Sequence, residues 1–266
     1  MIASGAYVTH RGAVRGENQD AIYFGGVMAG CTMDAPRAAG DGGGKPWIIA
    51  VADGIGGASA GQRASAEVVK ELMGGTDFSL VGVKALLAEV NLKLFGLGQR
   101  CIDLRGMGAA VAGLCWGGDG LLAFNVGDCR VYRQQDDFLA QVTKDDSFAQ
   151  LLVEVGQAPA GMIRDERVHS LTQCLGGRLQ CVEVDPHVHR LNLRHPGRFL
   201  ICSDGLSDAL GLDDMEEAMK GGLTPAVGVQ NLLNAALSHK AADNVSIVIV
   251  DVRPAIAHGE GARAVE

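Results

Sequence analysis

Four aspartates stand beside predicted strands in positions that suit a metal centre. Asp53 and Asp204 each follow a short apolar run directly, and each precedes a glycine. Asp128 follows another apolar run through Gly127, and Asp243 comes just before the last apolar run of the chain. If these strand ends meet at one edge of the fold, the carboxylates repel one another unless cations neutralise them.

The ligand types indicate which cations would fit. The aspartates have no matching set of Lys or Arg residues nearby and no histidine pattern. Oxygen ligands favour hard divalent ions, so Mg²⁺ or Mn²⁺ fits better than Zn²⁺. With Asp20 added, five negative charges would face two or three divalent ions, and the loaded site need not repel an anionic substrate. For any one aspartate the alternative is an ordinary turn or helix cap.

The stretch 47–65 shows how one element can position such a carboxylate. Residues 47–52 form an apolar run of the length of a buried strand, Asp53-Gly54 ends it, and helical spacing begins at Ser59. A hairpin would need a second strand directly after the turn. A nucleotide-binding loop would need G-x-G-x-x-G spacing or a Lys-Ser/Thr ending, and both are absent. A structural turn without function is the alternative that the stretch alone leaves open.

Composition and charge narrow the class of protein. The 266 residues are 47% apolar and 20% charged, which is typical of a globular protein with a sizeable core. The net charge of −8 argues against a basic nucleic-acid interface. No signal peptide and no apolar run of membrane-spanning length is visible, so we expect a cytoplasmic protein that does not enter a membrane. Seven scattered cysteines without a C-x-x-C pair predict reduced, buried thiols.

The order of elements predicts one domain. Strands are expected at 2–9, 21–25, 106–116, 121–126, 199–203 and 245–252, and helices at about 59–72, 83–94, 147–156 and from Thr224 onward. Strands and helices occur in blocks without regular alternation, which favours mixed or antiparallel sheets with helices outside. Residues 28–45 predict a mobile loop and residues 253–266 a disordered tail.

Seven short motifs carry a family resemblance. They are Arg15-x-x-Asn18-Gln-Asp20, Val51-Ala-Asp-Gly-Ile-Gly-Gly57 with Gly61 and Ala64-Ser65, Gly106-Met-Gly108, Val126-Gly-Asp-x-Arg130, Leu171-Thr-x-x-Leu-Gly176, Cys202-Ser-Asp-Gly-Leu206 and Asp243-Asn244. In this order and spacing the chain resembles the metal-dependent protein phosphatases, also called PPM or type 2C serine/threonine phosphatases. It looks like a compact bacterial member, and the resemblance covers about residues 3–252.

The resemblance implies a fold and a metal site. The fold is α+β, an αββα sandwich of two central, mainly antiparallel sheets flanked by helices, in a single domain over residues 1–252 with a flap at about 155–170. Asp53 would bridge two Mn²⁺ or Mg²⁺ ions, the Gly54 carbonyl would hold the first, and Asp204 and Asp243 would hold the second. Asp20 would bind through a water molecule.

The resemblance also implies a third ion and a phosphate ligand. Asp128, with Asp204, would hold a looser third ion. Arg15 would bind the substrate phosphate, because its forked guanidinium can bond two phosphate oxygens at once. We therefore expect Arg15, Asp53, Asp204 and Asp243 to act in catalysis.

The implied reaction is hydrolysis of phosphoserine or phosphothreonine by a hydroxide that bridges two metals. The partners would be a phosphorylated protein substrate and a cognate serine/threonine kinase, and we expect a monomer. Two alternatives are a catalytically weak regulator that binds phosphoproteins, and a two-metal hydrolase of small phosphoesters. No covalent phospho-enzyme is needed, so Ser203 and Cys202 are expected to be strand residues and not nucleophiles.

Several positions depart from the family pattern. Ile55 stands where many members have a histidine that is proposed as general acid, and Asp146 stands where the family has the histidine of an Asp-His-Ser motif. Cys129 stands in place of Ser, and Ala109-Ala110 in place of a threonine pair. Three other histidines show no partner pattern and are expected at the surface, namely His169, His187 and His189.

Overall fold

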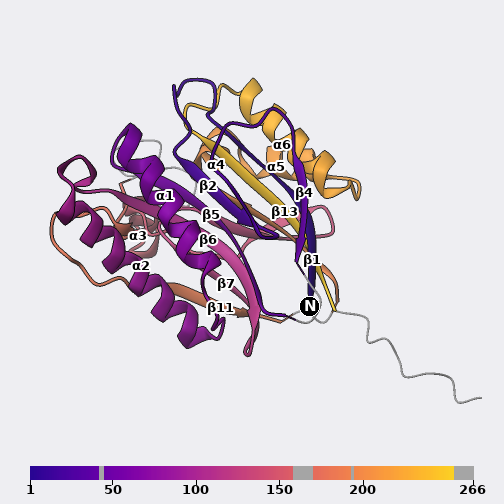
Figure 1. The fold of residues 1–266 in the computed structure, drawn as a ribbon. Coiled ribbons are helices and arrows are strands. Elements are labelled where there is room, and N and C mark those ends of the chain that lie inside the picture. The colour runs from indigo at the N-terminus through magenta and orange to yellow at the C-terminus, as the bar shows by residue number, and fades with distance from the viewer. Residues whose placement is uncertain (42–44, 158–169, 193–194, 255–266) are drawn as a thin grey trace, which may run out of the picture.

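Two antiparallel sheets lie at the centre of the molecule, with helices on their outer faces (Figure 1). The structure is a computed structural model, and it describes residues 1–41, 45–157, 170–192 and 195–254. Within these residues the sheets and helices form the αββα sandwich that the family resemblance implies. No helix in the described ranges combines the length and the apolar character needed to cross a membrane.

The first sheet contains both ends of the described chain. In spatial order its strands are β4 (Arg37–Asp41), β1 (Ile2–His10), β13 (Val245–Arg253), β12 (Gly197–Cys202), β8 (Arg130–Gln135) and β9 (Phe138–Gln141). Each neighbouring pair is antiparallel. Three helices pack on its outer side, α4 (Asp204–Ala209), α5 (Leu212–Met219) and α6 (Pro225–Ser238).

The second sheet contains the predicted metal-binding turn. Its strands are β11 (His187–Leu191), β7 (Gly120–Val126), β6 (Gly108–Gly117), β5 (Trp47–Ile55), β2 (Asp20–Phe24) and β3 (Val27–Ala29), and β10 (Leu175–Gly176) pairs with β6. Helices α1 (Ala58–Met73) and α2 (Leu80–Arg100) cover its outer face, and η1 (Ile102–Leu104) follows α2. Helix α3 (Phe148–Glu154) lies between β9 and β10 in the chain.

Strand β5 explains why the apolar run at 47–52 shows no alternation with polar residues. Ile49 and Val51 belong to the core that includes the space between the sheets, whereas Ala50 and Ala52 pack beneath α1 and α2. Successive side chains of a strand point to opposite faces, so a strand covered on both faces must be apolar at every position. The same alternation directs Asp53, at the end of the run, toward the other sheet.

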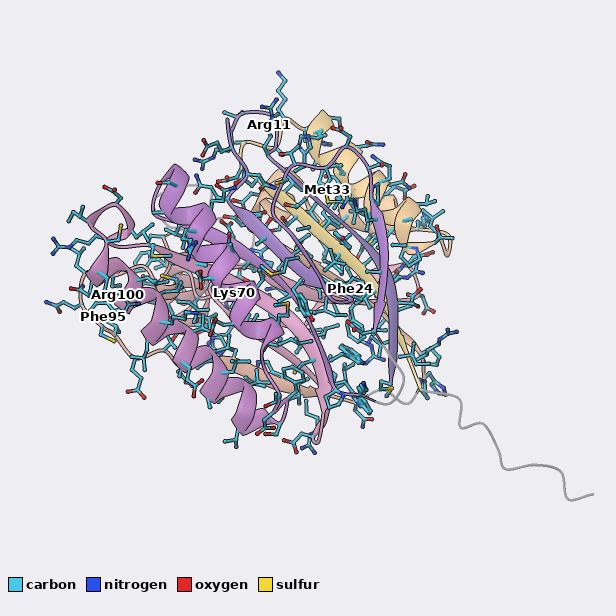
Figure 2. The ribbon with its side chains drawn as sticks, in the orientation of Figure 1. Arg11, Phe24, Met33, Lys70, Phe95 and Arg100 are labelled. Atoms are coloured by element: carbon cyan, nitrogen blue, oxygen red, sulfur yellow. The ribbon has the colours of Figure 1, made fainter. Side chains whose placement is uncertain are left out.

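Buried side chains in two hydrophobic clusters fill the spaces between the layers (Figure 2). Phe24 and Met33 are buried in the core that includes the space between the sheets, and Arg100 is exposed at the end of α2. The predicted helix starts are confirmed, because Ser79 Oγ accepts a hydrogen bond from the Gly82 amide at 3.0 Å and Thr224 caps α6 with Pro225 at its first position.

Some expectations need correction. Residues 28–45 were predicted as a mobile loop, but β4 lies within them and pairs with β1, and Met33 in the same segment is buried. All seven cysteines are free thiols, yet Cys31, Cys101 and Cys181 are exposed, so the prediction of burial holds only for some of them. The expected flap at about 155–170 and the tail at 253–266 fall mostly outside the described residues.

Candidate active site

Asp20 and Asp53 are directly opposite each other on β2 and β5. Asp20 is only 1% exposed. Burial is the main reason that the pKa of Asp20 rises to about 7 and that the pKa of Asp53 rises well above its ordinary value, and the charge of Asp204 raises both further. Like charges opposed across two strands destabilise a sheet, so the pair needs protons or cations.

Asp204 and Asp243 come from the other sheet. Strands β12 and β13 are antiparallel neighbours, and Cys202 is paired with Ile247. The residue that follows β12 and the residue that precedes β13 therefore lie at the same edge, as the sequence predicted. Burial raises the pKa of Asp204 to about 6, and burial followed by the charge of Asp204 raises the pKa of Asp53, so the two carboxyl groups are close enough to affect each other.

Asp128 lies where the chain passes from one sheet to the other. Strand β7 ends at Val126 in the second sheet, and β8 begins at Arg130 in the first. Burial, followed by the charges of Asp204 and Asp145, raises the pKa of Asp128 well above its ordinary value. The crossover therefore brings a further carboxylate to the same edge.

Gly54 occupies a position that has no room for a side chain. A Cβ at this residue would lie 2.0 Å from the Gly61 carbonyl oxygen and 2.7 Å from the Gln19 carbonyl oxygen. The tight approach between the end of β5 and the start of α1 thus requires glycine, and it keeps the backbone of Gly54 at the cavity wall.

Arg15 lies at the mouth of the site on the loop between β1 and β2. Its Nη2 donates to Asp243 Oδ2 at 2.6 Å, and the Arg15 side chain is 54% exposed. This hydrogen bond, together with the charges of Asp243, Asp53 and Asp204, raises the pKa of Arg15. The guanidinium therefore faces the carboxylates from solvent, where it could meet an incoming anion.

Asn244 holds the loop that carries Arg15. Its Nδ2 donates to the carbonyl oxygens of Arg11 at 3.0 Å and Glu17 at 2.8 Å, and its Oδ1 accepts from the Gln19 amide at 2.7 Å. The sequence shows Asn244 only as part of a motif and does not predict this role. Its place directly after a candidate metal ligand was the one available signal.

Most of the predicted site residues line one cavity of about 640 Å³. Its wall includes Arg15, Asp53, Gly54, Asp128, Asp204 and Asp243, together with Ile55. Asp20 is buried next to the wall, opposite Asp53. The apolar side chain of Ile55 offers no proton at the position where the family pattern often has histidine.

The carboxylates fit divalent cations. Asp20 Oδ1 and Asp204 Oδ1 are buried and accept no hydrogen bond within the described structure. Buried oxygen atoms normally have a partner, and a cation would supply one here. Among the described residues no three His, Cys, Asp or Glu side chains already form a finished ligand cage. The Arg15–Asp243 ion pair instead compensates part of the carboxylate charge.

Ser203 is buried behind the site and bonds the carboxylate of Asp20. Its Oγ donates to Asp20 Oδ2 at 2.7 Å and accepts from the Ser246 amide at 3.0 Å, and Ser203 is fully buried. Cys202 is also fully buried, which raises the pKa of its thiol to about 12. Cys202 ends β12, as the sequence predicts, whereas Ser203 follows the strand and precedes α4. Burial leaves neither side chain exposed for attack on a substrate.

The histidine predictions need one correction. His187 was expected to be a surface residue, but its Nε2 lies 2.9 Å from Asp146 Oδ1 and its side chain is 22% exposed. Its partner is the aspartate that departs from the family pattern. His189 is exposed, and His169 lies outside the described residues.

Comparison with known proteins adds independent information. Residues 33–239 match the family model described as protein phosphatase 2C. The chain is 31% identical over 259 residues to the serine/threonine protein phosphatase PstP of Mycobacterium tuberculosis, which covers 91% of this chain but 43% of PstP. It is 28% identical over 253 residues to the serine/threonine phosphatase stp of Listeria innocua, covering 91% of this chain and 93% of that protein. The chain therefore spans less than half the length of its mycobacterial relative.

Solved structures show the same architecture. A crystal structure of M. tuberculosis PstP has a TM-score of 0.78 at 30% identity and covers 96% of this chain and all of that one. The catalytic domain of PstP in complex with two manganese ions has a TM-score of 0.75 at 30% identity, again covering 96% of this chain and all of that one.

Proposed function

Since the chain belongs to the protein phosphatase 2C family, we propose that it hydrolyses phosphoserine and phosphothreonine in proteins. Support comes above all from one cavity in which four aspartates, Asp53, Asp128, Asp204 and Asp243, lie close to the exposed guanidinium of Arg15. The carboxylates are suited to cations, and the arginine is suited to a phosphate.

The cofactors are Mn²⁺ or Mg²⁺, two ions with a third held more loosely. Asp53, Gly54, Asp204 and Asp243 would hold the first two, with Asp20 close behind them. Asp128 and Asp204 would hold the third. When bound, the ions act as Lewis acids that lower the pKa of water and offset phosphate charge. A relative of this chain, PstP, has been crystallised with two manganese ions.

Arg15 binds and orients the phosphate. Its guanidinium can donate two parallel hydrogen bonds to phosphate oxygens, and its exposed position leaves the reacting phosphoryl group accessible from solvent. Asn244 keeps the Arg15 loop next to Asp243, so a phosphate bound by Arg15 is held close to the carboxylates. Ile55 has no proton to donate to the leaving oxygen, so water would have to supply that proton.

The biological setting follows the same proposal. The phosphatase acts on a phosphorylated protein and reverses a cognate serine/threonine kinase. We place it in the cytoplasm as a monomer, with residues 1–252 as a single catalytic domain. The match covers only 43% of PstP, so no property of the rest of PstP is attributed to this chain.

Metal-dependent turnover tests the proposal. The wild type should hydrolyse p-nitrophenyl phosphate and a phosphothreonine peptide in Mn²⁺, and EDTA should abolish both activities. Asp204→Asn should lower kcat by about 10²-fold or more, since it removes a charge that holds ions. Asp213→Asn, at an exposed position on α5, should behave as the wild type.

Two results would overturn the proposal. One is the absence of metal-dependent turnover on both substrates. The other is a clearly higher kcat/KM for nucleotides than for phosphopeptides, which would instead assign the site to small phosphoesters.

A further inference from the structure

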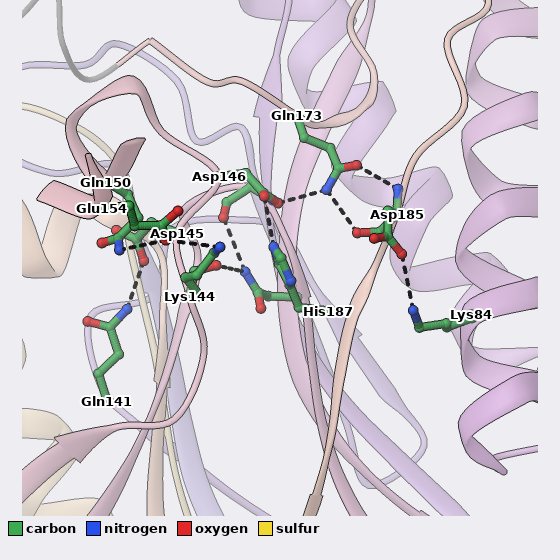
Figure 3. A network of polar contacts seen from close by, with 12 residues as sticks. Lys84, Gln141, Lys144, Asp145, Asp146, Gln150, Glu154, Gln173, Asp185 and His187 are labelled. Carbon is green, nitrogen blue, oxygen red and sulfur yellow. Dashed lines mark hydrogen bonds and ion pairs between the residues drawn. The ribbon is translucent and has the colours of Figure 1, made fainter. Parts of the chain in front are cut away.

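Asp146 joins three segments of the chain that are far apart in sequence (Figure 3). Its Oδ1 lies 2.9 Å from His187 Nε2 on β11, and its Oδ2 accepts from Gln173 Nε2 at 3.0 Å. The same Oδ2 accepts from the Gly127 amide at 2.9 Å. Asp146 is 9% exposed, so these donors replace water almost completely.

The Gly127 contact fixes the residue directly before Asp128. The Asp146 amide donates to the Gly127 carbonyl at 2.9 Å, so Asp146 bonds both the N–H and the C=O of Gly127. Asn125 Nδ2 donates to the same carbonyl at 3.2 Å. Gly127 has a φ of 100° and a Cβ there would lie 2.5 Å from Ala110 Cβ, so the turn has little freedom to adjust by itself.

The Gln173 contact fixes a second part of the cavity wall, the segment 171–174, which we call the rim. The Thr172 amide donates to the Asp146 carbonyl at 2.8 Å, and Gln173 also bonds the backbone of Asp185 in both directions. Leu171 and Cys174, on either side of these two residues, line the cavity. Asp146 thus holds the Asp128 turn and this rim to each other.

His187 determines how the Asp146 carboxylate is oriented. The two oxygens of a carboxylate are rigidly linked, so a bond to Oδ1 fixes the plane in which Oδ2 accepts from Gly127 and Gln173. Loss of His187 would leave Oδ1 in a site that is nearly closed to water, which costs free energy. The carboxylate would then rotate to find a new donor and weaken its hold on Gly127.

We propose that the Asp146–His187 pair positions Asp128, so that His187 is a positioning residue for the most loosely held ion. This inference rests on the proposed function, because Asp128 is taken as a metal ligand. His187 is not among the residues that line the cavity, so it would act only through Asp146 and the Gly127 turn. A partner that orients a ligand indirectly affects ion affinity more than it affects phosphate binding.

Manganese binding to the complete chain tests the inference directly. Protein stripped with EDTA is titrated with Mn²⁺ in a calorimeter for the wild type, His187→Ala, His187→Gln and His189→Ala. We expect His187→Ala to weaken the loosest Mn²⁺ site by about three- to tenfold. His187→Gln keeps an N–H donor and should restore most of this loss. His189→Ala, on the same strand, should bind as the wild type does.

Kinetics separate positioning from a general structural role. With p-nitrophenyl phosphate, His187→Ala should raise the Mn²⁺ concentration for half-maximal rate while KM stays within about twofold of the wild type. A His187→Ala protein with a lower melting temperature but unchanged Mn²⁺ affinity would overturn the inference. So would a wild type without a loose Mn²⁺ site. A wild type that binds Mn²⁺ but has no turnover would contradict the proposed function instead, and the calorimetric comparison would still decide the role of His187.

Discussion

At the level of single residues, the site is built from groups that are unstable without a partner. Asp20 and Asp53 face each other across two strands, and two buried aspartate oxygens have no hydrogen-bond donor in the described structure. Arg15 bonds Asp243 at the solvent side and compensates part of this charge. The same arginine is free to turn toward a phosphate once cations neutralise the carboxylates.

Replacing Arg15 tests its role in phosphate binding. Arg15→Ala should raise KM for p-nitrophenyl phosphate by about tenfold and change kcat less, since it removes two donors to the phosphate and no metal ligand. Steady-state kinetics at saturating Mn²⁺ measure both constants. Arg11→Ala, an exposed arginine of the same loop, is the matched control and should leave KM unchanged. An unaltered KM in Arg15→Ala would remove Arg15 from the phosphate site.

Replacing Asn244 tests whether it acts through the Arg15 loop. Asn244→Ala removes three hydrogen bonds to this loop and should raise KM several-fold. If both residues act on the same phosphate contact, the double variant Arg15→Ala/Asn244→Ala should have nearly the KM of Arg15→Ala alone. Additive effects on KM would show that Asn244 serves another purpose.

At the level of elements, strand ends and crossovers bring the carboxylates together. Asp53 ends the apolar part of β5, Asp204 follows β12, and Asp128 lies in the passage from one sheet to the other. The tight approach of β5 to α1 at Gly54 fixes the first of these ends. A disturbance at this point should therefore affect both stability and the site.

Gly54→Ala tests the approach of β5 to α1. The added Cβ would overlap the Gly61 carbonyl and should lower the free energy of unfolding by about 2 kcal/mol, with loss of most Mn²⁺-dependent activity. Denaturant unfolding in EDTA gives the stability without the contribution of bound ions. Gly118→Ala is the control, because a Cβ there meets no atom within 4 Å. Equal stability of the two variants would contradict the packing described here.

The sequence predicted elements whose periodicity is set by burial and missed those whose neighbours are distant in the chain. Strands β5 and β13 and helices α1, α2 and α6 were predicted because one continuous pattern defines each. The edge strand β4 was mistaken for part of a loop, since its residues gain their pairing from β1 and carry no apolar pattern. Strands β9 and β11 and helix α5 are short, and their positions also depend on tertiary contacts.

The candidate site was largely predicted, whereas the residues that support it were not. Aspartates beside strand ends followed by glycine can be recognised in the sequence, and the cavity contains nearly all of them. The bonds of Asn244 reach residues more than 200 positions away, and no local pattern indicates them. His187 was placed at the surface for the same reason, because its partner Asp146 lies on a different segment.

At the level of the whole molecule, the buried carboxylates link stability to protons and ions. The pKa of Asp20 rises from an ordinary 3.8 to about 7 and that of Asp204 from 3.8 to about 6, mainly through burial. Between pH 4 and 7 the folded protein therefore binds more protons than the unfolded chain. The free energy of unfolding from these groups falls as pH rises through this window.

Thermal unfolding at several pH values tests this linkage. In EDTA the melting temperature should fall between pH 5 and 7.5, and Asp20→Asn should make the fall shallower. Mn²⁺ competes with the same protons, so its stabilising effect should grow over the same range. A melting temperature in EDTA that rises steadily from pH 5 to 7.5 in the wild type, with no change of slope in Asp20→Asn, would contradict the linkage.

The central claim is that carboxylates from both sheets hold the ions that the proposed reaction needs. Anomalous diffraction from crystals soaked in Mn²⁺ tests it most directly, because it locates the ions without reference to activity. We predict at least two manganese peaks among Asp53, Asp204 and Asp243, with the Arg15–Asp243 ion pair broken. An intact Arg15–Asp243 pair with no manganese in this cavity would contradict the account.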